Sequence, residues 1–273
     1  MIIIGFSVAA AFIFTMSGVE ESSDLNIMMC CASCGIAGVD DIKLKDCSAC
    51  KLVKYCGVKC QREHRPQHKK ECKKRAAELR DEILFRQPES NHLGDCPICC
   101  LPLPLDPQKT TFTGCCSKTV CNGCICANMI RELEGKLQPK CPFCRRSVPK
   151  SQEERERNMM KRIEASDREA MCEMGTRRCG EGDYSAAFDY WTRAAALGDI
   201  HAHFELSILY RDGRVVEKDD KKQLHHLEVA AIGGDVSARN NLGLFEEKTG
   251  RTDRAVKHYI IAATLGNDSH WIP

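Results

Sequence analysis

Closely spaced cysteines dominate the first half of this sequence. Of the 20 cysteines among 273 residues, 18 lie between Cys30 and Cys144, and many form pairs separated by two or three residues. Such a pair can turn two sulfur atoms toward one metal ion, and zinc takes four ligands of this kind at about 2.0–2.3 Å. Disulfide-bonded domains show no preference for repeated close pairs. The spacing therefore predicts zinc sites.

The overall composition argues against a protein steered by charge to nucleic acid or membranes, and against one large globular domain. Lys and Arg number 40 against 38 Asp and Glu, which leaves a formal net charge of +2 and no global field that steers the chain toward nucleic acid or anionic membranes. Aromatic residues make up only 6% of the chain, and its 43% hydrophobic content includes the cysteines. We therefore expect two or three small domains rather than one large conventional core.

The first cluster of cysteines has a regular order. Its pairs are Cys31-x2-Cys34, Cys47-x2-Cys50, Cys56-x3-Cys60 and His68-x3-Cys72, which is enough for two tetrahedral sites. At every ligand position, segment 31–72 resembles a MYND zinc finger. The resemblance implies two interleaved zinc ions, one held by Cys31, Cys34, Cys56 and Cys60 and the other by Cys47, Cys50, His68 and Cys72. Such fingers dock short proline-containing peptides, so the resemblance also implies a peptide partner.

Segment 31–72 is expected to fold only with metal bound. So short a segment cannot bury enough apolar surface to offset its chain entropy, whereas one structural zinc ion contributes about 10–16 kcal/mol. Residues 43–80 carry 13 Lys and Arg against 4 Asp and Glu. We interpret this charge as partial compensation for thiolates around zinc. A nucleic-acid surface is disfavoured because only Tyr55 interrupts the basic residues as an aromatic.

A second cluster of cysteines begins with Cys-Pro-Ile-Cys at 96–99 and ends with Cys-Pro-Phe-Cys-Arg at 141–145. This arrangement resembles a RING finger. The cross-brace order of that family implies one zinc ion on Cys96, Cys99, Cys121 and Cys124. It implies a second on Cys141 and Cys144 together with Cys115 and Cys116. Four zinc ions, two per finger, are therefore expected.

The second RING-like site departs from the family pattern. Lys118 stands where the spacing C-x-H-x2-C has histidine, and a lysine ammonium has no lone pair for a metal. Cys115 can restore the number of ligands to four. Two adjacent cysteines, Cys115 and Cys116, can hold one ion only if the chain makes an unusual local turn.

RING fingers mostly act as ubiquitin ligases, which position a ubiquitin-conjugating enzyme without forming a covalent intermediate. The resemblance implies that Ile98 contacts that enzyme, that Pro142 supports this contact and that Arg145 bridges to ubiquitin. The alternative is that these residues only shape the zinc loops. Two hypotheses follow: a RING-type ubiquitin ligase or ligase component that recruits substrates through the MYND finger and repeats, or a non-enzymatic zinc-finger adaptor in regulatory complexes.

The last third of the sequence contains an internal repeat. The string Ala-Ala-Ala-Leu-Gly-Asp at 194–199 recurs in related form at 229–235 and 261–267. A period in the mid-thirties, with small residues and glycines at fixed positions, indicates stacked helix pairs. The pattern over 171–266 resembles Sel-like repeats, which are related to tetratricopeptide repeats. It implies a helical solenoid whose concave surface binds an unidentified protein.

The predicted fold class is therefore two small zinc-stabilised α+β fingers, MYND and RING-like, followed by an all-α helix-hairpin solenoid. We expect a helix and linker at 73–94, the RING-like finger at 95–146, a charged, solvated connecting helix at 147–170 and a terminal stub at 267–273. His201, His203, His225 and His226 are interpreted as ordinary helix residues, because no carboxylate or cysteine lies at a matching spacing.

Residues 1–28 leave three alternatives open. The apolar stretch 2–19 has no preceding Lys or Arg and is interrupted by polar residues. It is an artefactual or unstructured leader before a true start at Met28 or Met29, a membrane anchor, or a cleaved secretion signal. Secretion would expose many thiols to an oxidising compartment. The prediction is a cytoplasmic or nuclear protein, with anchoring through residues 2–19 as the alternative.

Overall fold

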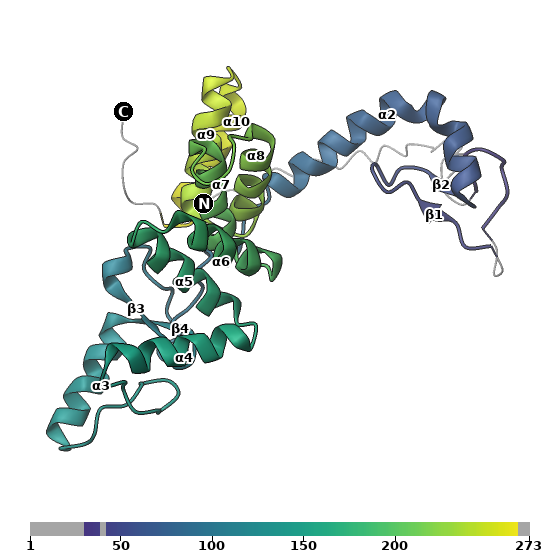
Figure 1. Ribbon diagram of the computed structural model, residues 1–273. Coiled ribbons are helices and arrows are strands. Elements are labelled where there is room, and N and C mark those ends of the chain that lie inside the picture. The colour runs from purple at the N-terminus through teal and green to yellow at the C-terminus, as the bar shows by residue number, and fades with distance from the viewer. Residues whose placement is uncertain (1–29, 39–41, 267–273) are drawn as a thin grey trace, which may run out of the picture. The chain divides into compact units, whose positions relative to one another are not determined.

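The computed structural model describes residues 30–38 and 42–266 (Figure 1). Backbone contacts divide the chain into two units, with the boundary between Asp81 and Glu82. The predictions for residues 1–28 and for the terminal stub at 267–273 lie outside the described residues. Within the described ranges, no helix is both long and apolar enough to cross a bilayer.

The first unit is a small finger with very short strands. β1 (Lys45–Asp46) pairs antiparallel with β2 (Lys54–Tyr55), and the chain then enters helix α2 (Val58–Leu84). The buried cluster of this unit contains one aromatic ring and three sulfurs, from Tyr55, Cys31, Cys47 and Cys50. Because so little apolar surface is buried, the unit depends on what its sulfur atoms bind.

Helix α2 is longer than the short helix expected after the first finger. It begins at Val58, so Cys60, His68 and Cys72 all lie on it. Its last residues belong to the second unit, where Leu84 is buried and its carbonyl accepts a hydrogen bond from the buried guanidinium of Arg239 on α9 (Val236–Lys248). The end of the helix is thus held by the core of the repeats.

The second unit contains residues 95–146, the segment predicted to form a RING-like finger and referred to by that name below. A short 3-10 turn, η1 (Pro107–Lys109), leads into the antiparallel pair β3 (Thr110–Thr113) and β4 (Lys118–Cys121), and helix α3 (Asn122–Glu134) follows directly. Its small core consists of Cys96, Leu103 and Val120. As in the first finger, a sulfur ligand occupies the centre of the core.

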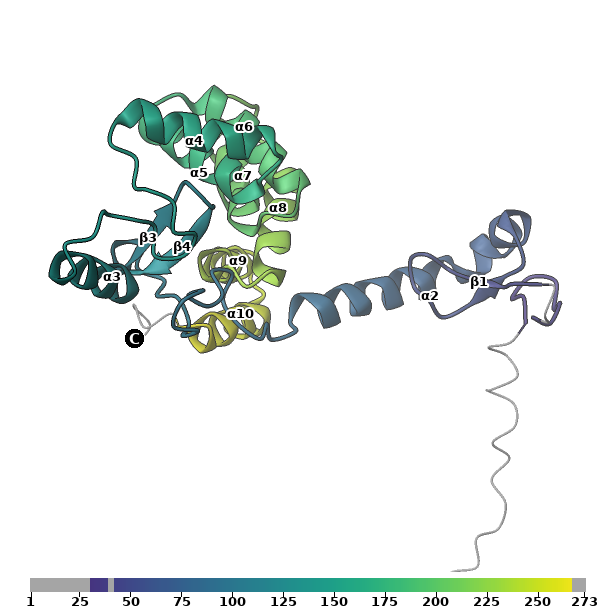
Figure 2. The same cartoon turned by 90° about the horizontal axis from the view of Figure 1, so that it is seen from below.

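Up to Gly266, where the described residues end, seven helices follow, and the later ones stack side by side (Figure 2). They are α4 (Gln152–Glu164), α5 (Arg168–Gly180), α6 (Tyr184–Ala196), α7 (Ile200–Asp212), α8 (Asp220–Ile232), α9 (Val236–Lys248) and α10 (Thr252–Thr264). The fingers followed by a helical solenoid confirm the predicted fold class.

The recurring Gly-Asp pair explains where these helices stop and start. Gly198, Gly234 and Gly266 adopt positive φ angles of 81°, 88° and 97°, which end a helix at low cost only for glycine. At the start of each of the helices α5 to α9, an N-cap aspartate accepts a hydrogen bond from a backbone N–H of the first turn. These caps are Asp167, Asp183, Asp199, Asp219 and Asp235.

Small residues allow the helices to approach closely. The largest buried cluster surrounds Trp191, which is 1% exposed, and includes Ala170, Ala194 and Ala202. Gly175 lies directly against the Trp191 indole ring, where a Cβ atom would come within 2.6 Å of it. Glycine is therefore required at this position by packing and not by backbone conformation.

The structure corrects the prediction of a solvated connecting helix at 147–170, because part of this segment is buried. α4 ends at Glu164, and Met159 and Ile163 on it are 1% and 3% exposed in the main cluster. Phe112 from β3 packs against the same cluster. Only two apolar positions of a charged helix are needed to form this narrow contact, so the sequence pattern did not reveal it.

Polar contacts also join α4 to the RING-like finger. The Arg162 guanidinium donates to the Ser117 hydroxyl at 3.2 Å and to the Cys116 carbonyl at 3.5 Å, and it pairs with Asp167. Asp167 is at the same time the N-cap of α5. One arginine therefore connects the turn that carries Cys116 to the start of the repeats.

A matched pair of glycine substitutions in α5 tests this packing. We expect Gly175→Ala to lower the free energy of unfolding by about 1–3 kcal/mol, because the added methyl group overlaps the Trp191 ring. In Gly180→Ala the new Cβ meets no atom within 4 Å among the described residues, so stability should rise by up to about 1 kcal/mol. Urea unfolding followed by circular dichroism measures both, and equal stabilities would contradict the packing argument.

Candidate metal centres

Four Cys-x2-Cys turns share one backbone geometry. In each, the residue after the second cysteine has a positive φ angle, between 56° and 74°, and donates its N–H to the carbonyl of the first cysteine at 2.9–3.0 Å. These residues are Gly35, Lys51, Cys100 and Arg145. The turn brings two sulfur atoms to the same side of the chain, so Cys100 and Arg145 have a structural role within it.

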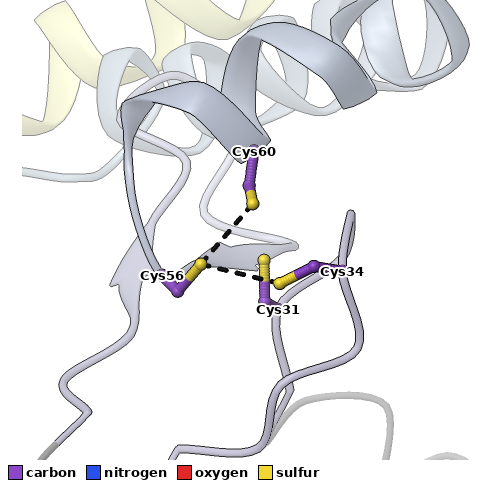
Figure 3. Close-up of side chains that lie close together, drawn as sticks. All are labelled: Cys31, Cys34, Cys56 and Cys60. Carbon is purple, nitrogen blue, oxygen red and sulfur yellow. Dashed lines mark hydrogen bonds between the residues drawn. The ribbon is translucent and has the colours of Figure 1, made fainter.

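The first group of ligands joins two loops to the start of α2. Figure 3 shows that the side chains of Cys31, Cys34, Cys56 and Cys60 converge. The sulfur of Cys56 lies 3.6 Å from that of Cys34 and 3.5 Å from that of Cys60. Tetrahedral zinc with bonds of about 2.3 Å places its sulfur ligands roughly 3.8 Å apart, so the group fits this ion.

The second group in the MYND segment contains the histidine. It consists of Cys47, Cys50, His68 and Cys72. The Cys50 sulfur lies 3.2 Å from His68 Nε2, and the Cys47 sulfur lies 3.7 Å from that of Cys72. His68 and Cys72 are one turn apart on α2, which also carries Cys60. One helix thus serves both sites, as an interleaved arrangement requires.

His64 supports this group, and sequence reasoning missed it. Its ring stacks on His68 with centroids 5.5 Å apart, and its Nδ1 lies 3.0 Å from the hydroxyl oxygen of the buried Tyr55. The only signal in the sequence was its position one turn before His68. Contacts of this kind restrict the orientation of a metal-binding ring.

The third group lies in the RING-like finger. The structure brings together Cys96, Cys99, Cys121 and Cys124, with 3.8 Å between the sulfurs of Cys99 and Cys121. Cys121 ends β4 and is the N-cap of α3, while Cys124 lies in the first turn of that helix. The site therefore ties the first turn of the finger to its central helix.

The fourth group contains the adjacent cysteines. Cys115 and Cys116 both face the last Cys-x2-Cys turn, with 3.4 Å between the sulfurs of Cys115 and Cys144 and 3.9 Å between those of Cys116 and Cys141. The chain turns here because Ser117 has a φ angle of +54° and donates its N–H to the Thr113 carbonyl. Lys118 is exposed at the start of β4.

The thiol pKa values show why each group suits a cation. Burial by itself raises the pKa of the Cys31 thiol, but hydrogen bonds from the backbone N–H groups of Cys34 and Cys56 have the larger combined effect. The net result is a pKa lowered to about 6. The same balance lowers the pKa of Cys96 to about 6. By contrast, burial and the neighbouring sulfurs raise the pKa of Cys124 to about 12. Only a positive ion allows all four thiols of such a group to ionise together.

Comparisons with known proteins agree with this division of the chain. Residues 31–72 match the family model of the MYND finger, and residues 168–199, 200–235 and 236–267 match that of the Sel1 repeat. The chain carries a MYND finger and three Sel1 repeats. The MYND finger is a zinc-binding domain, and both are protein-interaction domains. The chain is therefore a zinc-binding protein of the interaction type.

Solved structures with similar repeats come from two bacteria. A Sel1 repeat protein from Oxalobacter formigenes is 29% identical over 41% of this chain and 90% of its own, with a TM-score of 0.37. The protective antigen c5321 of uropathogenic Escherichia coli, which displays an SLR fold, is 25% identical over 45% of this chain and 28% of its own, with a TM-score of 0.40. A comparison with curated proteins found no match.

The three residues predicted to bind partners lie on the RING-like finger. Ile98 is 40% exposed in the first Cys-x2-Cys turn, and Pro142 is half-buried in the last one. Arg145 is exposed, and its Nη1 donates to the Asn128 side-chain oxygen on α3 at 2.9 Å. Asn128, which sequence reasoning missed, thus links the last turn to the central helix.

A fifth group of side chains with metal-ligand chemistry lies outside both fingers. It contains His92, His201 and Asp235. The sequence offered no signal for it because its members are far apart along the chain.

Cysteine-to-serine variants test the fourth group. We expect Cys115→Ser to hold one zinc ion fewer per chain than the wild type, because Lys118 cannot serve as a replacement ligand. Cys126→Ser is the matched control, since Cys126 is exposed and outside the four groups. Elemental analysis of the purified proteins gives the zinc content. An unchanged zinc content in Cys115→Ser would exclude Cys115 as a ligand.

Removal of zinc should affect the two kinds of fold differently. With a strong chelator, we expect the amide resonances of residues 31–72 to collapse to the dispersion of an unfolded chain, because metal supplies most of the folding energy there. The helices α5 to α10 have their own apolar clusters, so most of the helical circular dichroism should remain. Retained dispersion in the MYND segment after complete zinc removal would refute this.

Proposed function

We propose that this protein is a RING-type ubiquitin ligase or a component of one, in which the MYND finger and Sel1 repeats select protein substrates. The RING-like finger would recruit the charged ubiquitin-conjugating enzyme. It would then act by holding that enzyme and ubiquitin in a reactive arrangement, which requires positioning rather than acid–base chemistry. The proposal is carried by the exposed apolar side chains of this finger.

Exposed apolar side chains lie on three segments of this finger. Ile98 is 40% exposed in the first turn and Phe143 is 42% exposed in the last one. The helix α3 between them contributes further exposed apolar residues, namely Met129, Ile130 and Leu133. So many exposed apolar side chains on one small finger are typical of a protein-docking site.

The metal groups hold these three segments together. The third group joins the turn of Ile98 to the start of α3 through Cys99, Cys121 and Cys124. Further along the helix, the Asn128 amide nitrogen donates to the Lys140 carbonyl at 3.2 Å, directly before the last turn. A rigid apolar surface can therefore meet a conjugating enzyme without first paying the entropy of ordering its loops.

Arg145 would be the contact to ubiquitin. Its Nη1 donates to the Asn128 side-chain oxygen, which also accepts a bond from Arg131 Nη2 at 3.0 Å. A guanidinium has five N–H donors, so this bond leaves others for carbonyl groups of a partner. The bond to Asn128 would thus orient the Arg145 guanidinium and leave its other N–H groups available to ubiquitin.

The MYND finger would bind a proline-containing peptide, as its family implies. Ile36 and Leu52 follow the two Cys-x2-Cys turns of this finger, and each is 45% exposed. Exposed apolar side chains next to a rigid metal site suit a short extended peptide. The Sel1 repeats would supply a second protein-binding surface for the same substrate.

The state of the cysteines supports a cytoplasmic or nuclear location. Fifteen of the 20 cysteines belong to the four ligand groups, where their sulfur atoms lie close enough to share an ion. Free thiols at this density persist in reducing compartments and become oxidised outside them. Zinc binding of the kind proposed here needs the reduced form.

A ubiquitination assay with a matched variant tests the proposed activity. Zinc-loaded protein should modify itself when supplied with a panel of conjugating enzymes, and Ile98→Ala should reduce the rate at least about tenfold, as expected for an anchor side chain. Ile36→Ala removes an equally exposed isoleucine from the other finger and should leave the rate unchanged. Absence of activity with every conjugating enzyme would favour the non-enzymatic adaptor, which the departure at Lys118 also suggests.

A further inference from the structure

Two histidines and an aspartate from three distant segments meet within the second unit. His92 belongs to the segment between α2 and the RING-like finger, His201 to the first turn of α7, and Asp235 is the N-cap of α9. Asp235 Oδ2 lies 3.6 Å from His92 Nδ1 and 3.9 Å from His201 Nδ1. The two imidazole rings are stacked, with an angle of 9° between their planes.

The protein leaves both of these imidazole nitrogens without hydrogen bonds. His92 Nδ1 and His201 Nδ1 are buried atoms that have no hydrogen-bond partner within the described residues. Both face the Asp235 carboxylate, whose side chain is only 2% exposed. A buried polar atom without a partner costs about 1–3 kcal/mol, so two of them beside one buried carboxylate call for a ligand between them.

The distances suit a metal ion better than hydrogen bonds. Separations of 3.6 and 3.9 Å are too long for a hydrogen bond between nitrogen and oxygen. Zinc with bonds of about 2.1 Å in a tetrahedron places its nitrogen and oxygen ligands roughly 3.4 Å apart. We propose that His92, His201 and Asp235 bind a divalent transition-metal ion, zinc in particular, through Nδ1, Nδ1 and Oδ2.

Supporting contacts orient two of the three ligands. The other nitrogen of the His201 ring, Nε2, lies 3.3 Å from the carboxylate of Glu205 one turn later on α7. A carboxylate behind a metal-bound histidine selects the tautomer that leaves the facing nitrogen free to bind metal. The second oxygen of Asp235, Oδ1, accepts the backbone N–H of Ala238 at 2.7 Å. This helix cap directs Oδ2 toward the histidines.

The third ligand is held by the backbone of its own segment. The His92 N–H donates to the Gly234 carbonyl at 3.0 Å, directly before Asp235. Gly234 has a φ angle of +88°, and a Cβ there would lie 2.7 Å from the Ser90 carbonyl oxygen. The segment around His92 therefore packs directly on the turn between α8 and α9. A bound ion would fasten this segment to the Sel1 repeats.

The fourth coordination position would face solvent. His92 and His201 line an open groove of about 1040 Å³, together with Asp95 and Asp199. Water can complete the coordination of an ion held by three protein ligands, as in zinc sites with one open position. This site thus differs in chemistry from the four cysteine-rich groups, because its ligands are nitrogen and oxygen atoms.

The difference in ligands provides the test. Full-length protein is dialysed against a mild chelator that strips nitrogen and oxygen sites but leaves zinc on the cysteines, and is then titrated with Co²⁺. We expect one Co²⁺ per chain, with visible ligand-field bands and no thiolate-to-cobalt charge-transfer band. His92→Gln and His201→Gln should lose this uptake. His225→Gln, which removes an exposed histidine of α8, should retain it.

Two further measurements distinguish the loss of a metal ligand from a fold defect as the cause of lost Co²⁺ uptake. Saturating Co²⁺ should raise the melting temperature of the wild type and of His225→Gln but not of His92→Gln, because the ion binds only the folded array. Glu205→Gln should weaken Co²⁺ binding about 10- to 100-fold without abolishing it. The proposal is overturned if folded wild type takes up no Co²⁺, if His92→Gln binds it equally well, or if a charge-transfer band shows binding to cysteine.

Discussion

The amino-terminal half of this protein depends on the mutual repulsion of grouped thiolates and on the cation that relieves it. Four groups of ligand atoms lie close enough to share one ion each, and cysteines form part of the small buried core of both fingers. In each group the pKa of one thiol is lowered, at Cys31, Cys47, Cys96 or Cys141, while neighbouring thiols and burial raise the pKa of at least one other thiol. Zinc resolves this conflict, and its binding energy replaces the apolar core that these segments lack.

The carboxyl-terminal half is stabilised by different means. Helices of 13 residues end next to glycines with positive φ angles, α5 to α9 begin at aspartate caps, and alanine and glycine allow close packing around Trp191. The RING-like finger belongs to both systems, because its cysteines need metal while Phe112 and Ser117 contact α4 and the repeats. Metal loss in this finger would therefore leave part of its structure attached to the repeats.

This construction suits a protein that brings other proteins together. The MYND finger and the Sel1 repeats are interaction domains, and rigid metal sites present apolar side chains that would otherwise collapse into a core. The same physical device serves the ligase proposal and the adaptor alternative. They differ only in whether the apolar surface around Ile98 accepts a conjugating enzyme.

Most of the fold could be predicted because the decisive signals are short-range. The ligand pairs, their interleaved order and the repeat period all lie within stretches of about 40 residues, and a family pattern records each of them. The departure from the family pattern at Lys118 was also visible in the sequence. The adjacency of Cys115 and Cys116 already called for a local turn, and the structure has a positive φ angle at Ser117. Ligand identity in a metal finger is a local property of the chain.

Tertiary structure alone decided which distant side chains meet. The sequence by itself determined the MYND finger, the helical array and the grouping of cysteines into candidate zinc ligands. It could not show that Met159 and Ile163 are buried, that Arg162 reaches the turn of Cys116, or that His92 meets His201 and Asp235. The physical reason is that these contacts depend on how whole helices pack, and helix packing is set by the summed surfaces of many residues rather than by any local spacing.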